Sequence, residues 1–412
     1  MSSKDKMNIK KLVLPPLKWA LIGFLIGIAS GVVGGLFSLA VSFVTGVRGE
    51  NRWIVFLLPL GGLLSVFIYK LFRVTGTGTD DAVESAHSEK RVSPRLTPAV
   101  FICSVITHLF GGSAGREGAA LKMGGGIAAL FSKIVKPDEK GRRTMALAGM
   151  SGLFAAVFGT PVGAAVFTVE VVRSKSIKLW AVLVSLVSSI TAFYVALLLG
   201  ASPERYHVGE IPGLSLDLLW RVCALCALSG IVSYVFCYAM HHSPRLAKKA
   251  IGNDYIRILV LSLAIVALTV VVGCSDYNGG GINVIEGLFE GEQVKYEAFA
   301  LKILFTALTV AAGFKGGEIV PAFFVGATFG GAAAVVLGLP VPFGAALGMV
   351  ALFCGATNCP IATLILGTEM FGLGGIGYFV ISVILSFLLS GELSLYDGKK
   401  FPFKELRAEK PL

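Results

Sequence analysis

The chain has 412 residues, of which 55% are hydrophobic and only 15% are charged, and its mean hydropathy is +0.79. Soluble proteins have about 25% charged residues, so this composition excludes an ordinary soluble protein and predicts a multi-pass membrane protein. The formal net charge of +11 fits membrane orientation and contact with anionic lipids, because the sequence contains no soluble basic domain that would bind nucleic acid.

The N-terminal segment 1–15 is basic and leads into a long apolar segment. That segment exceeds the hydrophobic region of a signal peptide, so the sequence predicts that the first helix stays in the protein. Basic residues cluster in Lys4–Lys18, Lys133–Arg143, Arg173–Lys178, Arg245–Lys249 and Lys399–Lys410. Cytoplasmic loops of membrane proteins carry an excess of Lys and Arg, so this distribution predicts that both termini are cytoplasmic.

Several apolar stretches approach or exceed the roughly 20 residues that a helix needs to cross the hydrocarbon of a bilayer. In chain order they are Trp19–Val47, Trp53–Phe72, Leu179–Leu199, Leu218–Met240, Ile256–Val272 and Ile376–Ser390. Other apolar segments are shorter and interrupted by Gly or Pro, which a membrane tolerates only where protein or water receives the freed backbone groups. The sequence therefore predicts an all-α fold that includes broken helices.

Residues 74–81 follow the second apolar stretch with the sequence Val-Thr-Gly-Thr-Gly-Thr-Asp-Asp. Glycine lets the backbone approach a ligand closely, as at Gly78, and the hydroxyl of Thr77 can donate a hydrogen bond. The stretch therefore has the composition of an anion cradle. An ordinary turn capped by Thr and Asp is the alternative interpretation.

Each half of the chain contains a glycine-rich turn that delivers a glutamate to the start of an apolar helix. The two turns are Gly115-Arg116-Glu117-Gly118 and Gly316-Gly317-Glu318. A carboxylate within a membrane is costly, so such residues usually line a polar path and change protonation there. The first N–H groups of a helix can hold either a carboxylate or an anion. A charged Glu117 can therefore displace an anion and leave when it is protonated, which couples proton and anion movement.

Glu318 is a second titratable group beside the predicted anion position. It can relay protons or tune Glu117 by like-charge repulsion. A static helix cap is the alternative interpretation of either glutamate. Near the C-terminus, the hydroxyl of Tyr396 can donate to an anion and its ring can close the inner mouth. For this residue the alternative is an interfacial belt tyrosine.

The two halves share a further pattern. Pro161 is followed nine residues later by Glu170, and Pro360 is followed nine residues later by Glu369. Corresponding Gly/Pro-interrupted segments in two halves are typical of a repeat transporter with its site at the repeat interface. For both glutamates we expect a structural role, either as a helix cap or in an ion pair with an arginine such as Arg173.

The expected organisation has four parts: a cytoplasmic segment 1–15, a first membrane repeat 16–200, a second, inverted repeat 201–398 and a short cytoplasmic tail 399–412. The cysteines and histidines show no spacing typical of a metal site, so the sequence predicts no metal and no cofactor. An enzyme would need a nucleophile with a base or a His-Glu-x-x-His cluster, and neither pattern is present.

Taken together, these segments resemble the CLC family of anion channels and anion/proton antiporters. The match runs over nearly the whole membrane region, in the order found in that family. Gly76-Thr77-Gly78-Thr79-Asp80 is similar to the family's GSGIP loop, Gly115-Arg116-Glu117-Gly118-Ala119 to GREGP, Gly317-Glu318-Ile319-Val320-Pro321 to GxFxP, and Leu395-Tyr396 to its central tyrosine.

The resemblance implies an all-α bundle of tilted and broken helices in two inverted halves. It also implies a homodimer with a separate pathway in each subunit, and Glu117 as the gating glutamate. The residues that it places around the anion are Thr77, Gly78, Gly115, Arg116, Gly118, Ile319, Val320 and Tyr396.

The departures from the family pattern are informative. The family's chloride/proton exchangers carry a second, cytoplasm-facing glutamate where this chain has Val171, and an apolar residue is usual where it has Glu318. With Thr77 in place of serine, these departures are similar to the fluoride/proton antiporter branch. The resemblance thus implies export of fluoride in exchange for protons across a prokaryotic plasma membrane. A chloride channel or chloride/proton exchanger is the alternative.

Overall fold

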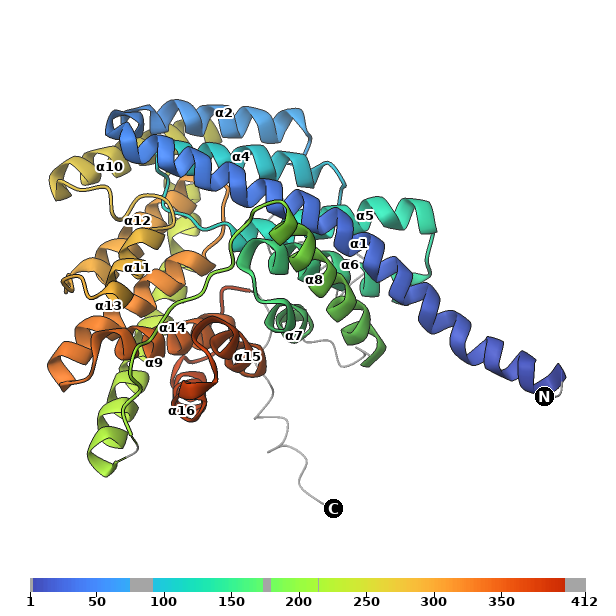
Figure 1. Cartoon of the computed structure of the whole chain (residues 1–412). Helices are drawn as coiled ribbons and strands as arrows, with labels where there is room; N and C mark the ends of the chain where they lie inside the picture. Colours follow the sequence, from blue (N-terminus) through green and yellow to red (C-terminus); the bar gives the residue numbers. More distant parts are fainter. Residues whose placement is uncertain (1–2, 75–91, 173–178, 214, 397–412) are drawn as a thin grey trace, which may run out of the picture.

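The computed structural model describes residues 3–74, 92–172, 179–213 and 215–396, which form helices joined by short loops (Figure 1). The all-α prediction is confirmed, since the described residues contain no strand beyond one isolated bridge. The elements are α1 Ser3–Glu50, η1 Arg52–Leu57, α2 Leu58–Leu71, α4 Leu96–Phe110, α5 Glu117–Val135, α6 Glu139–Phe158, α7 Pro161–Val172, α8 Leu179–Leu198, α9 Leu216–Ala250, α10 Asp254–Val272, α11 Ile282–Glu290, α12 Ala298–Ala312, α13 Ile319–Leu337, α14 Val341–Thr357, α15 Pro360–Phe371, η2 Leu373–Gly375 and α16 Ile376–Leu389.

Seven helical stretches in the described residues are long and apolar enough to cross a membrane. They are Leu17–Glu50, Arg52–Leu71, Glu117–Val135, Trp180–Leu198, Leu216–Ala250, Asp254–Val272 and Ile319–Leu337. Five of them contain or closely overlap a predicted crossing stretch, whereas predicted Ile376–Ser390 corresponds to the shorter α16. Two, α5 and α13, were not singled out as crossing helices and lie mostly inside the protein. The chain is a multi-pass membrane protein.

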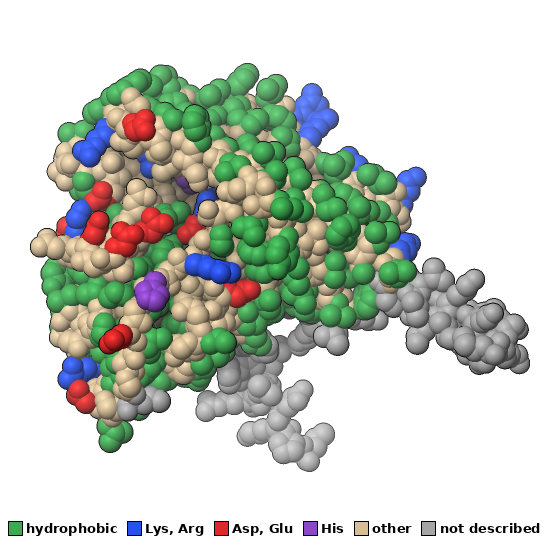
Figure 2. Space-filling view, in the orientation of Figure 1, with side chains coloured by type: hydrophobic (Ala, Val, Ile, Leu, Met, Phe, Trp, Pro, Cys, Tyr) green, Lys and Arg blue, Asp and Glu red, His purple; other side chains and the backbone are tan. Residues whose placement is uncertain are grey.

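The surface of the bundle carries the apolar side chains that such helices must present to hydrocarbon. Phe43 of α1 is 72% exposed, Leu198 of α8 is 87% exposed and Val271 of α10 is 82% exposed. Figure 2 shows hydrophobic side chains over most of the visible face, interrupted by a hollow with acidic side chains along its rim. Exposed apolar area of this extent marks a surface that water does not cover.

The interior is organised around two similar sets of three consecutive helices. The first set is α5, α6 and α7, with 19, 20 and 12 residues, and the second is α13, α14 and α15, with 19, 17 and 12 residues. Within each set the first two helices cross at glycines. A Cβ atom on Gly124 would lie 2.3 Å from the carbonyl oxygen of Gly149, and a Cβ atom on Gly326 would lie 2.5 Å from that of Gly348. Only glycine permits these backbone approaches.

The third helices of the two sets, α7 and α15, pack together, and each caps the other. The Glu170 carboxylate near the end of α7 accepts hydrogen bonds from Ile361 N (3.2 Å) and Ala362 N (2.7 Å) at the start of α15. The Glu369 carboxylate near the end of α15 accepts from Val162 N (3.0 Å) and Gly163 N (2.8 Å) at the start of α7. A carboxylate at a helix N-terminus satisfies free N–H groups and opposes the positive end of the helix dipole. Capping, one of the two predicted structural roles, is thus observed for both glutamates, whereas Arg173, the predicted ion-pair partner, lies outside the described residues.

Replacing either capping carboxylate is expected to destabilise the fold. Glu369→Ala leaves two N–H groups at the start of α7 without acceptors, at a cost of about 1–2 kcal/mol. Glu170→Ala should cost a similar amount because its contacts mirror those of Glu369. Thermal unfolding of the purified proteins, detected by size-exclusion chromatography, measures the effect. The control is Glu392→Ala, which removes an exposed carboxylate. Equal midpoints for all three variants would contradict the capping role.

Candidate functional site

The two glycine-rich turns meet at the centre of the molecule. Gly115 N donates to Gly317 O and Gly317 N donates to Gly115 O, both at 2.7 Å, as an isolated antiparallel bridge. A Cβ atom on Gly317 would lie 2.3 Å from Gly118 N, so no larger residue fits there without moving backbone. The bridge places the first turns of α5 and α13 side by side. Each helix start offers free N–H groups and about half a unit of positive charge.

Glu117 is the first residue of α5 and is fully buried. Its Oε2 accepts a hydrogen bond from Arg116 N at 3.1 Å, and its Oε1 lies 3.5 Å from Arg116 Nε. The predicted position at a helix start, inside the protein, is therefore confirmed. Because no water covers this carboxylate, its charge depends on Arg116 and on the helix start, which is the setting expected for a group that changes protonation.

Glu318 lies across the bridge from Glu117, as the N-cap residue of α13. Its Oε2 is 3.6 Å from the point that a Cβ atom on Gly118 would occupy, so the carboxylate passes beside the first turn of α5. Ile319 and Val320 form the first turn of α13, and both are buried. The structure thus brings the two predicted glutamates to one place.

Tyr396 lies at one end of a row of aromatic rings that contact one another. Tyr396 is 3% exposed, and Leu395 N before it donates to Ala356 O at 2.7 Å, near the end of α14. The rings in contact are, in order, Tyr396–Phe167 with centroids 6.2 Å apart, Phe167–Phe353 at 5.5 Å, Phe353–Phe323 at 5.0 Å and Phe323–Phe158 at 5.3 Å. These phenylalanines could not be predicted as site residues, because isolated Phe residues in apolar helices have the sequence pattern of an ordinary core. Thr77 and Gly78 lie outside the described residues.

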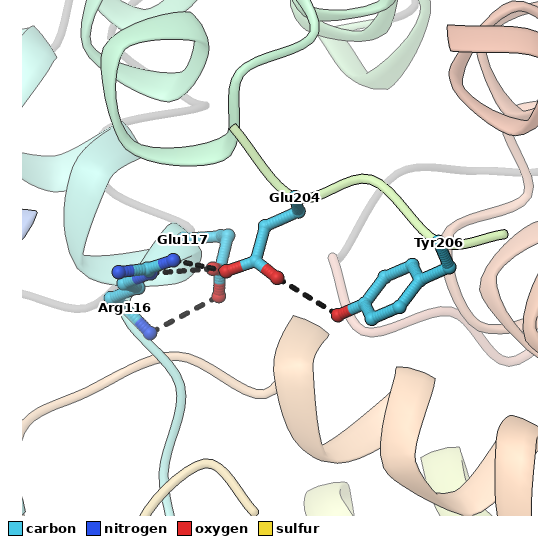
Figure 3. A network of polar contacts seen from close by, with 4 residues as sticks. All are labelled: Arg116, Glu117, Glu204 and Tyr206. Atoms are coloured by element: carbon cyan, nitrogen blue, oxygen red, sulfur yellow. Dashed lines mark hydrogen bonds and ion pairs between the residues drawn. The ribbon is translucent and has the colours of Figure 1, made fainter. Parts of the chain in front are cut away.

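Arg116 connects Glu117 to a residue that the sequence analysis missed (Figure 3). Its Nη2 donates to Glu204 Oε1, and Glu204 Oε2 accepts a hydrogen bond from the Tyr206 hydroxyl at 2.8 Å. Burial and the negative charge of Glu204 raise the pKa of Tyr206 well above its usual value, so this hydroxyl stays protonated and donates. The available signal was the polar run 204–207, Glu-Arg-Tyr-His, between two apolar stretches.

Arg116 and Glu204 form part of the wall of a hollow, which we call the outer hollow, with a volume of about 650 Å³. It lies at the end of α1 away from the basic N-terminus, where Arg48 and Gly49 line it. Its lining includes Glu204, Asp276 and Glu286. Figure 2 shows acidic side chains beside a hollow on the visible face. The hollow ends at Gly115 and Val320, beside the bridge between the two turns. It leads from one side of the protein to the residues next to the buried carboxylate.

Two basic side chains are buried beside the outer hollow, and one of them, Arg48, lines it. Arg48 donates to His108 O, and Lys302 Nζ donates to Tyr277 O at 3.1 Å and Gly279 O at 2.7 Å. Within the part of the chain that the structure describes, these acceptors are neutral carbonyls, so the positive charge of Arg48 has no ionised partner among them. Unbalanced buried charge raises the potential of a nearby cavity and attracts anions.

The fold and the site define a multi-pass helical membrane protein in which two similar helix sets begin at one buried, positively polarised point that holds a carboxylate. The family model described as "Voltage gated chloride channel" matches residues 61–391. The chain belongs to this family, the CLC proteins.

The chain is similar to several individual CLC proteins over most of its length. A chloride/fluoride channel protein of Pseudomonas syringae pv. tomato is 32% identical, over 93% of this chain and 86% of the relative. The crystal structure of a CLC-type fluoride/proton antiporter superposes with a TM-score of 0.89 at 29% identity, covering 93% of this chain and 98% of that one. An H⁺/Cl⁻ exchange transporter of Vibrio vulnificus is 25% identical, over 86% of this chain and 82% of the relative.

Proposed function

We propose that this protein exports fluoride from the cytoplasm in exchange for protons. The observation that carries the proposal is Glu117, a fully buried carboxylate at the point where two helix N-termini meet. The likeness to a fluoride/proton antiporter over nearly the whole of both chains supports the choice of ion and the coupling to protons. The 32% identical relative, named a chloride/fluoride channel protein, supports fluoride as an ion of this branch.

In the proposed cycle, ionised Glu117 occupies the anion position beside the starts of α5 and α13. Fluoride displaces the carboxylate, which then takes up a proton and carries it through the pathway. Fluoride is small and a strong hydrogen-bond acceptor, so backbone N–H groups and hydroxyls are suitable donors. The proposed contacts come from the two helix starts, the loop and the inner tyrosine, with the residues Thr77, Gly78, Gly115, Arg116, Gly118, Ile319, Val320 and Tyr396.

Glu318 has the role of proton relay or tuning group in this proposal. Its carboxylate passes the first turn of α5, so its charge acts on the position that Glu117 and fluoride share. In this proposal the aromatic rings from Tyr396 to Phe158 line the rest of the anion pathway. The edges of such rings carry partial positive charge and can border an anion without binding it strongly.

A chloride channel or chloride/proton exchanger is the second candidate. It is supported by the 25% identical relative named as an H⁺/Cl⁻ exchange transporter. The inner proton route of the family's exchangers uses a glutamate where this chain has Val171, and Val171 is buried in α7 with 2% exposure. An apolar side chain cannot carry protons, so a chloride/proton exchanger of that type fits this site less well.

A flux measurement decides between the candidates. We expect purified protein in liposomes to take up fluoride when a proton gradient is applied, and to move protons when a fluoride gradient is applied. Chloride under the same gradients should move much more slowly. Fluoride and pH electrodes record both ions in the same vesicles. Proton-coupled chloride uptake at an equal rate, or fluoride flux without proton movement, would contradict the proposal.

The remaining features of the proposal concern assembly and orientation. We infer a homodimer with one pathway in each subunit, in the plasma membrane of a prokaryote and in contact with its lipids. Both termini are proposed to be cytoplasmic, with the halves 16–200 and 201–398 inverted. The basic segments support this orientation, and apolar side chains such as Ile361, 63% exposed, offer area to a second copy or to lipid.

A further inference from the structure

The guanidinium of Arg116 is shared by two carboxylates from distant parts of the chain. Arg116 Nε lies 3.5 Å from Glu117 Oε1, and Arg116 Nη2 donates to Glu204 Oε1 (Figure 3). The Arg116 and Glu204 side chains are 9% and 10% exposed, and that of Glu117 is 0% exposed. Charges with so little contact with water interact strongly, because solvent screens them weakly.

When both carboxylates are ionised, the side chains of Arg116, Glu117 and Glu204 together carry one more negative charge than positive charge. One guanidinium then faces two negative groups, and the buried cluster has a net charge of −1. Uptake of a single proton makes the cluster neutral, which removes the cost of burying an unbalanced charge. The two carboxylates therefore compete for one arginine.

Glu204 is held in place rather than free to move. Its N donates to Phe158 O at 3.2 Å, and its Oε2 accepts from the Tyr206 hydroxyl at 2.8 Å. Tyr206 is itself fixed, since its ring stacks on Phe289 with centroids 4.9 Å apart and its N donates to Met370 O at 3.1 Å. These contacts hold the Glu204 carboxylate in one position against Arg116.

Glu204 faces water where Glu117 does not. Among the described residues, the lining of the outer hollow includes Glu204 and Arg116 and stops short of Glu117. A proton from this side therefore reaches the cluster first at Glu204. The other charged or titratable groups that face the hollow are Arg48, His108, Asp276 and Glu286.

Glu286 is the neighbour most able to influence Glu204. It lies on α11, which also lines the hollow, and partial burial raises its pKa, with further contributions from the negative charges of Glu204 and Glu290. Its side chain is exposed, however, and does not reach Arg116 among the contacts in the described part of the chain. Removing Glu204 therefore changes the pairing of Arg116, whereas removing a rim carboxylate changes only a screened charge.

We propose that Glu204 is a positioning residue that sets, from the outer hollow, the proton affinity of Glu117. Ionised Glu204 draws the guanidinium away from Glu117 and repels its negative charge, so Glu117 takes up a proton more readily. Without the negative charge of Glu204, Arg116 pairs with Glu117 alone, which stabilises the ionised carboxylate in the anion position. This inference rests on the proposed role of Glu117 as the gating group.

The test follows protonation of Glu117 directly. Infrared difference spectra of the purified full-length protein, recorded across a pH titration, show the carbonyl stretch of protonated carboxyls. The band that disappears in Glu117→Gln is assigned to Glu117. In Glu204→Gln its midpoint is expected to fall by about one pH unit, because Glu117 gains Arg116 and loses a negative neighbour. Glu204→Asp keeps the negative charge, so the Glu117 midpoint should return most of the way to its wild-type value.

Two further variants separate this role from a structural one. Glu210→Gln removes an exposed carboxylate from the same loop and should leave the midpoint unchanged. Tyr206→Phe removes the donor that holds the Glu204 carboxylate against Arg116, so the Glu117 midpoint is expected to fall by a smaller amount. Tyr206→Phe also provides the test if Glu204→Gln does not fold. An unchanged midpoint in a folded Glu204→Gln or Tyr206→Phe protein would overturn the inference.

The infrared titration requires no transport, so it is independent of which ion the protein carries. Fluoride flux measured in parallel shows whether the inference about Glu204 or the proposed function has failed. If the wild-type protein exchanges fluoride for protons while Glu204→Gln leaves the Glu117 midpoint unshifted, the inference about Glu204 is wrong and the proposed function stands. If the midpoint shifts but the wild-type protein moves no fluoride, the carboxylate pair is as proposed and the assignment of the ion is wrong.

Discussion

Liposomes that contain Glu117→Gln are expected to show no proton movement driven by a fluoride gradient, a loss of about 100-fold or more. An amide has the size of the carboxyl group but cannot bind and release a proton, so the proton leg of the cycle disappears. Glutamine is also uncharged and no longer competes with an anion at the starts of α5 and α13. Fluoride can then pass without coupling. Fluoride and pH electrodes measure the two ions in the same vesicles.

The matched control is Glu139→Gln. Glu139 is an exposed glutamate in the first turn of α6 that pairs with Arg143, so the substitution is chemically the same but lies away from the site. It should leave coupled exchange at the wild-type level. Proton-driven fluoride uptake at the full rate in Glu117→Gln would show that another group carries the proton, and Glu318 would become the first candidate.

Gly317→Ala is expected to disrupt both folding and transport. The new methyl group would lie 2.3 Å from Gly118 N and 2.7 Å from Gly118 Cα, so the starts of α5 and α13 must move apart. That movement breaks the paired 2.7 Å hydrogen bonds between Gly115 and Gly317. Overpacking and two lost buried hydrogen bonds together cost on the order of 3–5 kcal/mol. The thermal unfolding midpoint and the fluoride flux should both fall steeply.

Gly377→Ala serves as the control for this substitution. Gly377 lies in α16, and a Cβ atom there would meet nothing within 4 Å. Alanine favours a helix by about 1 kcal/mol relative to glycine, so this variant should be as stable as the wild type or slightly more so. If Gly317→Ala melted and transported like the wild-type protein, the close contact of the two turns would not be required.

Much of the helical content could be predicted because a membrane imposes strong rules on sequence. Long apolar stretches such as Trp19–Val47 and Leu179–Leu199 became α1 and α8, since hydrocarbon leaves the backbone no other partner for its polar groups. Crossing length was less predictable for α5 and α13. Glycine lowers the hydropathy of α5, and both helices pack through buried glycine contacts such as Gly124–Gly149 rather than facing lipid.

The candidate site was partly predictable for the same reason. Burying a glutamate at the start of an apolar membrane helix costs free energy, so such a residue usually has a function. Glu117 and Glu318 therefore stood out in the sequence. The phenylalanines around Tyr396 did not, because an aromatic residue at a site has the same local sequence as one in a core. Glu204 lies in a loop without a counterpart in the other half of the chain, and nothing in its neighbours indicates a partner 88 positions away.

The sequence alone determined the class of protein, the order of its helices and the two acidic turns, because hydropathy, glycine spacing and charge are local properties of the chain. Only the tertiary structure decided that Gly115 and Gly317 bond to each other, that α7 and α15 cap one another, and that Arg116 divides its charge between Glu117 and Glu204. These contacts join residues far apart in the chain. They exist because burial forces each polar group to find a partner, and folding decides which partner is within reach.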